Sequence, residues 1–160
     1  MSHDLIIPKY SLVETKVGDY AEEIAQLYCK TISVNHINEH EGFNNMLANV
    51  LHHQRSNIAA VTACVDYDDS LIGAVSYGFY RDYEPNHGRI FKIAVQPEHQ
   101  RGGVGRELLS YAESCLTVMG AIAIELNAKQ AAIDFYKKAG YEMPEGQSEP
   151  YHFFKSLLLP

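Results

Sequence analysis

The chain lacks the features that mark several common classes of protein. It has only three cysteines, Cys29, Cys64 and Cys115, and no Cys-x-x-Cys pair, so neither a disulfide framework nor a thiolate zinc site is expected. The adjacent His52 and His53, like the other histidines, have no metal-ligand spacing with a carboxylate or thiol, and no metal is expected. Apolar residues surround each cysteine, which predicts buried thiols.

Long apolar runs and an excess of positive charge are also missing. No stretch approaches the roughly 20 apolar residues of a membrane span, and the first residues do not have the basic and then apolar pattern of a signal peptide. The 13 Lys plus Arg residues are outnumbered by 20 Asp plus Glu residues, which disfavours a general nucleic-acid binder. We therefore expect a cytoplasmic protein that binds neither membranes nor nucleic acid. The length of 160 residues predicts one domain over residues 1–160.

Apolar periodicity divides the chain into alternating strands and helices. The expected strands are Tyr10–Lys16, Asn57–Tyr67, Leu71–Tyr80, Arg89–Val95, Ala121–Leu126, a short one from Tyr141 to Met143, and Tyr151–Leu158. The expected helices are one capped by Gly18-Asp19 with a face from Tyr20 to Ile32, then Gly42–His53, Val104–Met119 and Ala131–Ala139. The pattern predicts an α/β (α+β) fold with a mixed sheet of about seven strands and about four helices.

Two connections set the expected topology. The Asp-rich turn Asp66–Ser70 joins two apolar runs and predicts an antiparallel hairpin, which the strand Arg89–Val95 extends to a meander. The helix between Arg89–Val95 and Ala121–Leu126 predicts that these two strands lie parallel and adjacent, joined by a right-handed crossover.

The segment Gln100–Arg106 is rich in glycine, follows an apolar strand and opens a helix. Glycine lets a backbone approach a ligand closely, and the free N–H groups and dipole of a helix N-terminus attract anions. A P-loop is excluded because Arg106 follows Gly105, and the dinucleotide fingerprint is excluded because Leu108 replaces its third glycine. The segment predicts a phosphate or pyrophosphate cradle, although a plain turn that starts a helix could use the same glycines.

Two motifs together resemble the GNAT superfamily of acyl-coenzyme A-dependent N-acetyltransferases. The first is Gln-x-x-Gly-x-Gly from Gln100 to Gly105, and the second comprises Asn127, Phe135, Tyr136, Gly140 and Tyr141. Two motifs at the expected separation are more specific than either alone. The resemblance implies a GNAT-like sheet in which the fourth and fifth strands splay into a V-shaped gap, opened by a β-bulge in the fourth. It also implies acetyl-coenzyme A as co-substrate.

The resemblance further implies roles for individual residues. A backbone N–H near Ile93 or Ala94 would stabilise the oxyanion, and Tyr136 would be the general acid that protonates the leaving thiolate, unless it only packs under the cofactor. Asn127 would position the pantetheine or a water, or else cap the next helix. The expected cofactor-binding residues are Ile93, Ala94, Val95, Gln100, Arg101, Gly102, Gly103, Val104, Gly105, Arg106, Asn127 and Tyr136.

The general base is left open by the sequence. Glu84 is the candidate that we place in the site, with His87, Glu125, Tyr77 and a water chain as alternatives. The acceptor would be a small-molecule amine or a peptide amine, shaped by three segments: Ser33–Glu41, Arg81–Gly88 and Pro144–Pro150. His152 enters the last strand near the acceptor side, and the apolar tail that follows is compatible with a homodimer as well as with core packing.

The expected function is transfer of an acetyl group from acetyl-coenzyme A to a primary amine by direct attack. No covalent acyl-enzyme is expected, because none of the three cysteines has a histidine nearby in the sequence pattern. The alternatives are an acyltransferase with a longer acyl donor, one that acts on a protein N-terminus or lysine, and a coenzyme A-binding sensor or interaction module without turnover.

Overall fold

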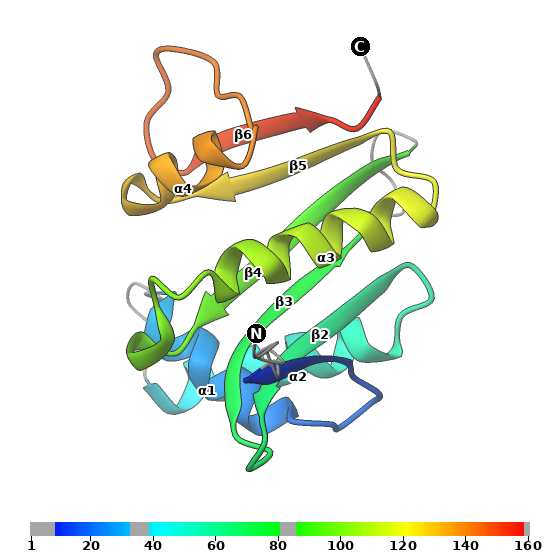
Figure 1. Ribbon diagram of the computed structural model, residues 1–160, viewed down its shortest axis with the longest axis vertical. Coiled ribbons are helices and arrows are strands. Elements are labelled where there is room, and N and C mark those ends of the chain that lie inside the picture. Colours follow the sequence, from blue (N-terminus) through cyan, green and yellow to red (C-terminus); the bar gives the residue numbers. More distant parts are fainter. Residues whose placement is uncertain (1–8, 33–38, 81–85, 159–160) are drawn as a thin grey trace, which may run out of the picture.

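A computed structural model describes residues 9–32, 39–80 and 86–158, the side chains of 39–41 excepted (Figure 1). The order of elements is β1 Tyr10–Glu14, α1 Ala21–Thr31, α2 Glu39–Arg55, β2 Ala59–Asp66, β3 Leu71–Gly78, β4 His87–Val95, α3 Val104–Val118, β5 Ala123–Ala128, α4 Ile133–Lys138 and β6 Tyr151–Ser156. Short 3-10 turns, η1 Pro97–His99 and η2 Gln130–Ala132, precede α3 and α4.

The six strands form one mixed sheet in the order β1-β2-β3-β4-β5-β6. The first four strands are antiparallel neighbours, β4 and β5 are parallel, and β6 returns antiparallel to β5. The hairpin, the meander and the parallel crossover are therefore confirmed. The described residues contain six strands, where about seven were predicted, because the segment after Tyr141 makes only an isolated bridge from Glu142 to Phe154. Pro144 follows at once and has no N–H with which to continue the pairing.

Several predicted boundaries were wrong for local reasons. Asp19 does not cap α1: its carboxylate accepts the backbone N–H of Lys16, and Tyr20 occupies the N-cap position with a φ of 54°. Helix α2 begins at Glu39, so the last residues of the expected link are helical, and the rest of that link lies outside the described residues. His87 and Gly88 belong to β4 and not to a loop.

Strand β5 begins later than predicted because the end of α3 takes up the residues before it. The backbone N–H of Ala121 donates to the carbonyl of Leu116 at 2.9 Å and closes the last turn of α3. The strand then runs from Ala123 to Ala128, so Asn127 lies inside it. Helix α4 has six residues and is shorter than predicted, because its first turn is the 3-10 turn η2.

The two faces of the sheet carry separate hydrophobic cores. Helix α3 packs on one face through residues such as Leu108 and Leu116, and α4 adds Tyr136 to the same core. Helices α1 and α2 cover the other face through residues such as Ile24 and Val50. Each fully buried aliphatic side chain contributes about 1.5–3 kcal/mol, so both helical layers are firmly held against the strands between them.

Strands β4 and β5 separate soon after they meet, as Figure 1 shows. Their parallel pairing covers only three residue pairs, from His87 with Ala123 to Arg89 with Glu125. On its other side β4 has one extra residue against β3, since Ser76 faces Lys92 whereas Tyr77 faces Ile90, so that Phe91 forms a bulge. The predicted splay and the predicted bulge in the fourth strand are both present.

The three cysteines are free thiols, with Cys64 buried and Cys29 and Cys115 partly buried. Burial raises the pKa of the Cys64 thiol to about 12, so this side chain is a poor nucleophile at neutral pH. Of the helices in the described part of the chain, none combines the length and the apolar character that a bilayer crossing requires.

Candidate active site

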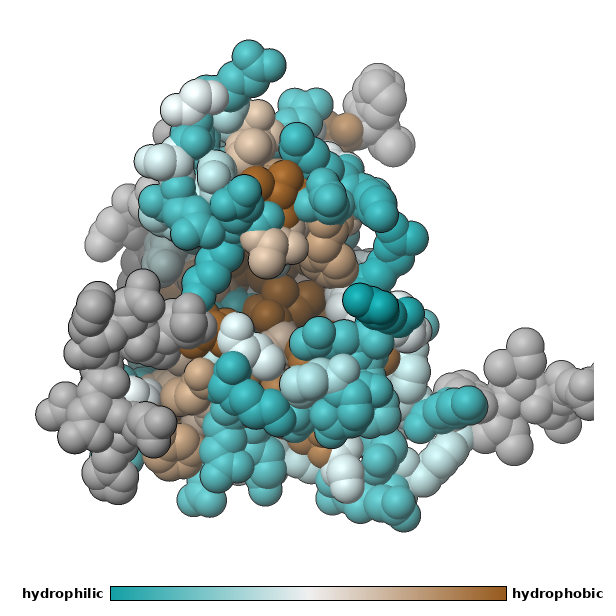
Figure 2. All heavy atoms as spheres, turned by 90° about the vertical axis from the view of Figure 1, so that its left-hand side faces the viewer, coloured by the Kyte–Doolittle hydropathy of each residue, from teal (hydrophilic) through white to brown (hydrophobic). Residues whose placement is uncertain are grey.

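A cavity of about 650 Å³ lies where β4 ends, between the loop that leads into α3 and the helix α4. Figure 2, which faces the side toward which β4 and β5 run, shows hydrophobic side chains in the hollow and hydrophilic ones around it. Nine of the twelve predicted cofactor-binding residues line this cavity: Ile93, Ala94, Val95, Gln100, Arg101, Gly103, Gly105, Arg106 and Tyr136. Residues from three elements far apart in the sequence thus meet in one space.

The other three predicted residues do not line the cavity. Val104 turns its side chain into the core beneath α3, where it is buried. Gly102 is exposed at the outside of the loop, and Asn127 is exposed further along β5. Gly102 and Val104 stay close to the cavity because their neighbours Arg101, Gly103 and Gly105 line it, whereas no residue of β5 does.

The loop before α3 presents backbone N–H groups to the cavity. Gly103 is the N-cap residue with a φ of 85°, and Arg101 also has a positive φ of 74°. The first backbone bond of the helix runs from the N–H of Glu107 to the carbonyl of Gly103, at 3.1 Å. No hydrogen bond among the described residues occupies the N–H groups from Arg101 to Arg106. With the two arginine side chains beside them, these groups have the charge and the free donors that suit an anion.

The edge of β4 that faces the gap offers further backbone groups. The N–H of Gln96 donates to the carbonyl of Ile72 on β3 at 2.7 Å, and antiparallel pairing alternates along the strand. With Ala74 opposite Ala94, the backbone of Ala94 is turned toward β3, whereas the backbones of Ile93 and Val95 are turned toward the gap. Of the two predicted oxyanion donors, Ile93 is therefore the one whose N–H points at the open space.

Tyr136 forms part of the inner wall of the cavity. Its side chain is 6% exposed and packs against Phe135, Tyr141 and Phe153, with ring centroids 5.0–5.7 Å apart. Burial raises the pKa of its phenol to about 12, because the charged phenolate would lose its hydration. Tyr136 is therefore a neutral phenol, with a proton to donate, at any physiological pH.

A cluster of polar side chains lies on the face of the sheet that carries α1 and α2, beside the point where β4 and β5 separate. Glu125 Oε2 is 3.6 Å from His87 Nδ1, and Glu125 Oε1 is 3.3 Å from His152 Nε2. The other ring nitrogen of His152, Nδ1, is 3.4 Å from Asn127 Oδ1. Among the described residues, Glu125 Oε2 and His87 Nδ1 are buried and make no hydrogen bond. We call these four residues, from three neighbouring strands, the apex cluster.

The remaining predicted side chains lie elsewhere. Glu84 is outside the described residues, so the structure does not place it. Tyr77 is fully buried under α3, with its hydroxyl 3.1 Å from Thr62 Oγ1, and does not reach the cavity.

Sequence reasoning missed several residues of the cavity wall. Phe135 lies 3.5 Å from where a side chain on Gly105 would begin, and Ala132 and Lys138 line the wall with it. Ala132, Phe135 and Lys138 follow one another at a spacing of three residues, which places them on one helical face. Because Phe135 belongs to the second motif, this spacing could have predicted the other two as neighbours of the cavity. His99 also lines the cavity, but its position in a polar turn gave no such signal.

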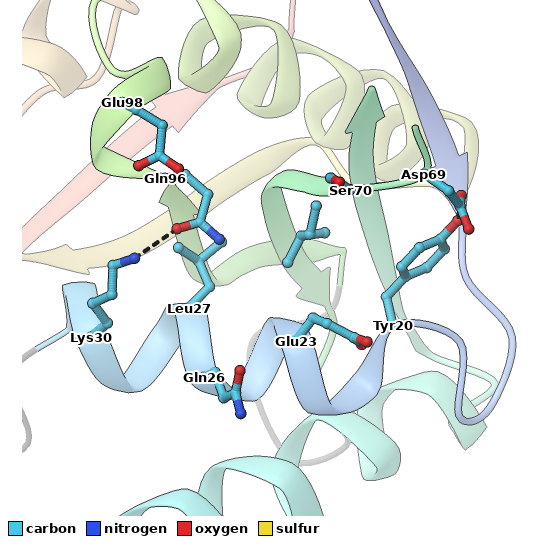
Figure 3. A pocket seen from close by; sticks show the side chains of 10 residues that line it. Tyr20, Glu23, Gln26, Leu27, Lys30, Asp69, Ser70, Gln96 and Glu98 are labelled. Atoms are coloured by element: carbon cyan, nitrogen blue, oxygen red, sulfur yellow. Dashed lines mark hydrogen bonds between the residues drawn. The ribbon is translucent and has the colours of Figure 1, made fainter. Parts of the chain in front are cut away.

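A second cavity, of about 600 Å³, lies between α1, the turn that leads into β3 and the residues that follow β4 (Figure 3). Lys30 Nζ donates to Gln96 Oε1 at 2.9 Å, and the hydroxyl of Tyr20 donates to the carboxylate of Asp69. The carboxylates of Glu23 and Glu98 also line it, so its charge opposes an anionic ligand. The cavity at the end of β4 is therefore the better candidate for the predicted cradle.

The sequence of the chain is similar to those of known acetyltransferases. The profile of the acetyltransferase (GNAT) family matches residues 21–141. The uncharacterized N-acetyltransferase YjcF of Bacillus subtilis is 35% identical over 57 residues, which are 36% of this chain and 41% of that protein.

Two solved structures have the same fold. One is an acetyltransferase of the GNAT family from Desulfovibrio desulfuricans, with a TM-score of 0.75 and 16% identity over 93% of this chain and 99% of that one. The other is the PaiA N-acetyltransferase of Thermoplasma acidophilum in complex with coenzyme A, with a TM-score of 0.70 and 18% identity over 93% of this chain and 99% of that one.

Proposed function

Because the chain belongs to the acetyltransferase (GNAT) family, we propose that it transfers an acetyl group from acetyl-coenzyme A to a primary amine by direct attack within a ternary complex. We propose further that residues 1–160 form one such domain. A single observation carries the proposal: the unpaired N–H groups before α3 and the gap-facing backbone of β4 open into the same cavity. The PaiA enzyme of the same fold binds coenzyme A, which supports this choice of donor.

The residues of the cavity fit the parts of the donor in order. The N–H groups of residues 101–106 would hold the pyrophosphate, and the guanidinium groups of Arg101 and Arg106 would balance its charge. The backbone of Ile93 and the N–H of Val95 would pair with the amides of the pantetheine arm, as a further strand would do. Gly105 keeps this passage open, because a side chain there would lie between Phe135 and Val95.

The same groups could carry the chemistry. As the amine nitrogen bonds to the thioester carbon, the N–H of Ile93 would donate to the carbonyl oxygen on which negative charge develops. As the carbon–sulfur bond breaks, Tyr136 would give its phenolic proton to the sulfur. The nitrogen loses two protons overall, of which one replaces the proton of Tyr136 and the other leaves to solvent. Holding both reactants in one cavity would supply the remaining advantage by proximity.

The test is to measure thiol release from acetyl-coenzyme A with a panel of primary amines, and binding of coenzyme A by calorimetry. We expect binding together with thiol release on at least one amine. Binding without release on any amine would favour a sensor, and absence of binding would overturn the assignment of the cavity. The Gly105→Val variant, which fills the passage, should lose binding and release together. A homodimer stays a prediction, for which measurement of the mass in solution is the test.

A further inference from the structure

We propose that His152 is the general base for the acceptor amine, that Glu125 positions it, and that the acceptor is therefore a protonated alkylamine. This inference rests on the proposed function and assigns it a base that neither the sequence nor the family match supplies. It starts from the apex cluster, in which one carboxylate lies between two imidazole rings on three adjacent strands.

Exposure distinguishes the members of the cluster. The side chain of Glu125 is 14% exposed, and its Oε2 is buried, whereas the side chain of His152 is 39% exposed. A base must reach both the acceptor and the solvent that finally takes the proton. The exposed fraction shows that His152 reaches solvent, and imidazole is the side chain whose basicity best suits proton transfer near neutral pH. Glu125 is shielded behind it and is suited to orient the ring.

The carboxylate decides which ring nitrogen is free. Glu125 can only accept a hydrogen bond while it is ionised, so the neutral ring is stabilised with its proton on Nε2, 3.3 Å from Glu125 Oε1. The lone pair is then on Nδ1. Asn127 Oδ1 lies 3.4 Å from Nδ1 and has no proton to donate, so Nδ1 is free to take a proton from the amine, and the Nδ1–H that results can donate to this oxygen. A carboxylate that fixes the tautomer of a histidine base is a known catalytic arrangement.

The backbone places this ring beside the gap. His152 is opposite Asn127 on β5, two residues beyond Glu125, where the pairing of β5 with β4 ends. The backbone N–H of His152 donates to Gln147 Oε1 at 2.7 Å, which fixes the start of β6. Because side chains alternate across a sheet, His152 and Glu125 lie on the face opposite Phe153, which is buried with α3 and Tyr136. The proposed base and the proposed acid thus approach the gap from opposite faces.

The step balances as follows. His152 Nδ1 takes one proton from the protonated amine, directly or through one water, and the nitrogen lone pair that is released attacks the thioester carbon. The imidazolium passes the proton to solvent, and the carboxylate of Glu125 stabilises the positive charge in between. His87 contacts the other oxygen of Glu125 from β4 and limits its movement.

The experiment compares two amines in the thiol-release assay: an alkylamine that is turned over, and an amine already neutral at the assay pH, such as methoxyamine. For His152→Gln we expect kcat/KM to fall about 100-fold with the alkylamine and less than about 3-fold with methoxyamine, because the neutral amine needs no base to free its lone pair. The affinity for coenzyme A should stay within 2-fold. Glu125→Gln should show the same selective loss, to a smaller extent.

The control is Glu113→Gln. Glu113 is buried to a similar degree, with 15% of its side chain exposed, and is paired with Lys155 at 2.7 Å on the other face of the sheet. This variant should keep activity with both amines. Equal loss with both amines in His152→Gln, or no loss, would overturn the inference and leave the proposed function in place. If the wild-type protein releases no thiol with any amine, the proposed function fails, and the inference with it.

A second measurement is independent of activity. Nitrogen NMR of the imidazole rings, without acetyl-coenzyme A, reports which nitrogen carries the proton. The neutral ring of His152 should carry it on Nε2 in the wild-type protein and should shift toward the other tautomer in Glu125→Gln. A proton on Nδ1 in the wild-type protein would overturn the inference.

Discussion

The side chain of Gln100 donates a hydrogen bond from Nε2 to the carbonyl oxygen of Val95, at 3.1 Å. This bond holds the loop before α3 against the end of β4. The carbonyl of Val95 can accept it because that carbonyl is not paired with β3. We expect Gln100→Ala to weaken coenzyme A binding several-fold, because the N–H groups of the loop would no longer be held in place, while the free energy of unfolding falls by about 1 kcal/mol. Calorimetry and urea unfolding measure the two effects. An unchanged affinity would show that the loop keeps its shape without this bond.

A substitution at Gly105 should affect the stability of the protein and its affinity for coenzyme A in opposite directions. A Cβ at this position would lie 3.5 Å from the ring of Phe135 and 3.6 Å from Val95 Cγ2, which is ordinary contact within the protein. Gly105→Ala should therefore fold well and should gain up to about 1 kcal/mol from helix propensity. It should nevertheless bind coenzyme A more weakly, because the methyl group occupies the passage. Ser110→Ala, at an exposed position of the same helix, is the control and should leave affinity unchanged.

Tyr136→Phe removes a proton donor and keeps the packing of the ring. Turnover should fall about 100-fold with little change in the affinity for coenzyme A. Because burial raises the pKa of the phenol to about 12, Tyr136 stays protonated as the pH rises and is lost as an acid only near that value. A fall of kcat below pH 10 therefore cannot come from Tyr136.

Tyr141→Phe makes the matched control for this variant. Tyr141 packs against Tyr136 at 5.7 Å between ring centroids and is not part of the cavity wall. We expect its replacement to leave turnover unchanged. If Tyr136→Phe also keeps full turnover, the acid role is excluded and the ring serves only to pack against the donor.

The acid stability of the protein should depend on His53. This side chain is 7% exposed and stacks on Phe91, with ring centroids 4.5 Å apart, and its pKa is lowered to about 4 by burial first and then by the charges of Lys92 and His52. The folded state holds His53 neutral, so between pH 6.5 and pH 4 the unfolded state binds more protons. Stability should fall as the pH drops through this range, by on the order of 2–3 kcal/mol.

His53→Phe keeps the stacking and has no proton to bind, so it should flatten this part of the stability curve. The measurement is urea unfolding at pH 7 and at pH 4.5. His52→Gln, at the exposed neighbouring position, removes only the smallest of the three causes that lower the pKa of His53, so it should keep most of the wild-type pH dependence. If His53→Phe also keeps the wild-type pH dependence, groups other than His53 determine how the free energy of unfolding falls at acid pH.

The sequence predicted the elements that depend on local patterns. The meander, the crossover and the glycine-rich loop follow from apolar periodicity and turn residues, and nine of the predicted residues line one cavity. Boundaries were less certain because they depend on tertiary contacts, as where the bond from Ala121 to Leu116 delays β5. The apex cluster could not be predicted as a unit, because His87, Glu125 and His152 meet only through the register of three strands. A one-residue shift in that register would turn Glu125 to the other face.

The short pairing of β4 with β5 makes the width of the gap sensitive to the angle between the two strands. Three residue pairs, from His87 to Arg89, are the pivot, and the six residues from there to Val95 form an arm of about 20 Å. Over that length, a rotation of about 3° at the pivot displaces the mouth by about 1 Å, a distance that can cost a reaction about 100-fold in rate. Gly88 sits in the pivot, with Leu116 at 3.0 Å from where its side chain would begin, so the contact that sets the angle of the arm is far from the chemistry. Substitutions in this strand segment would therefore tune the width of the opening from a distance.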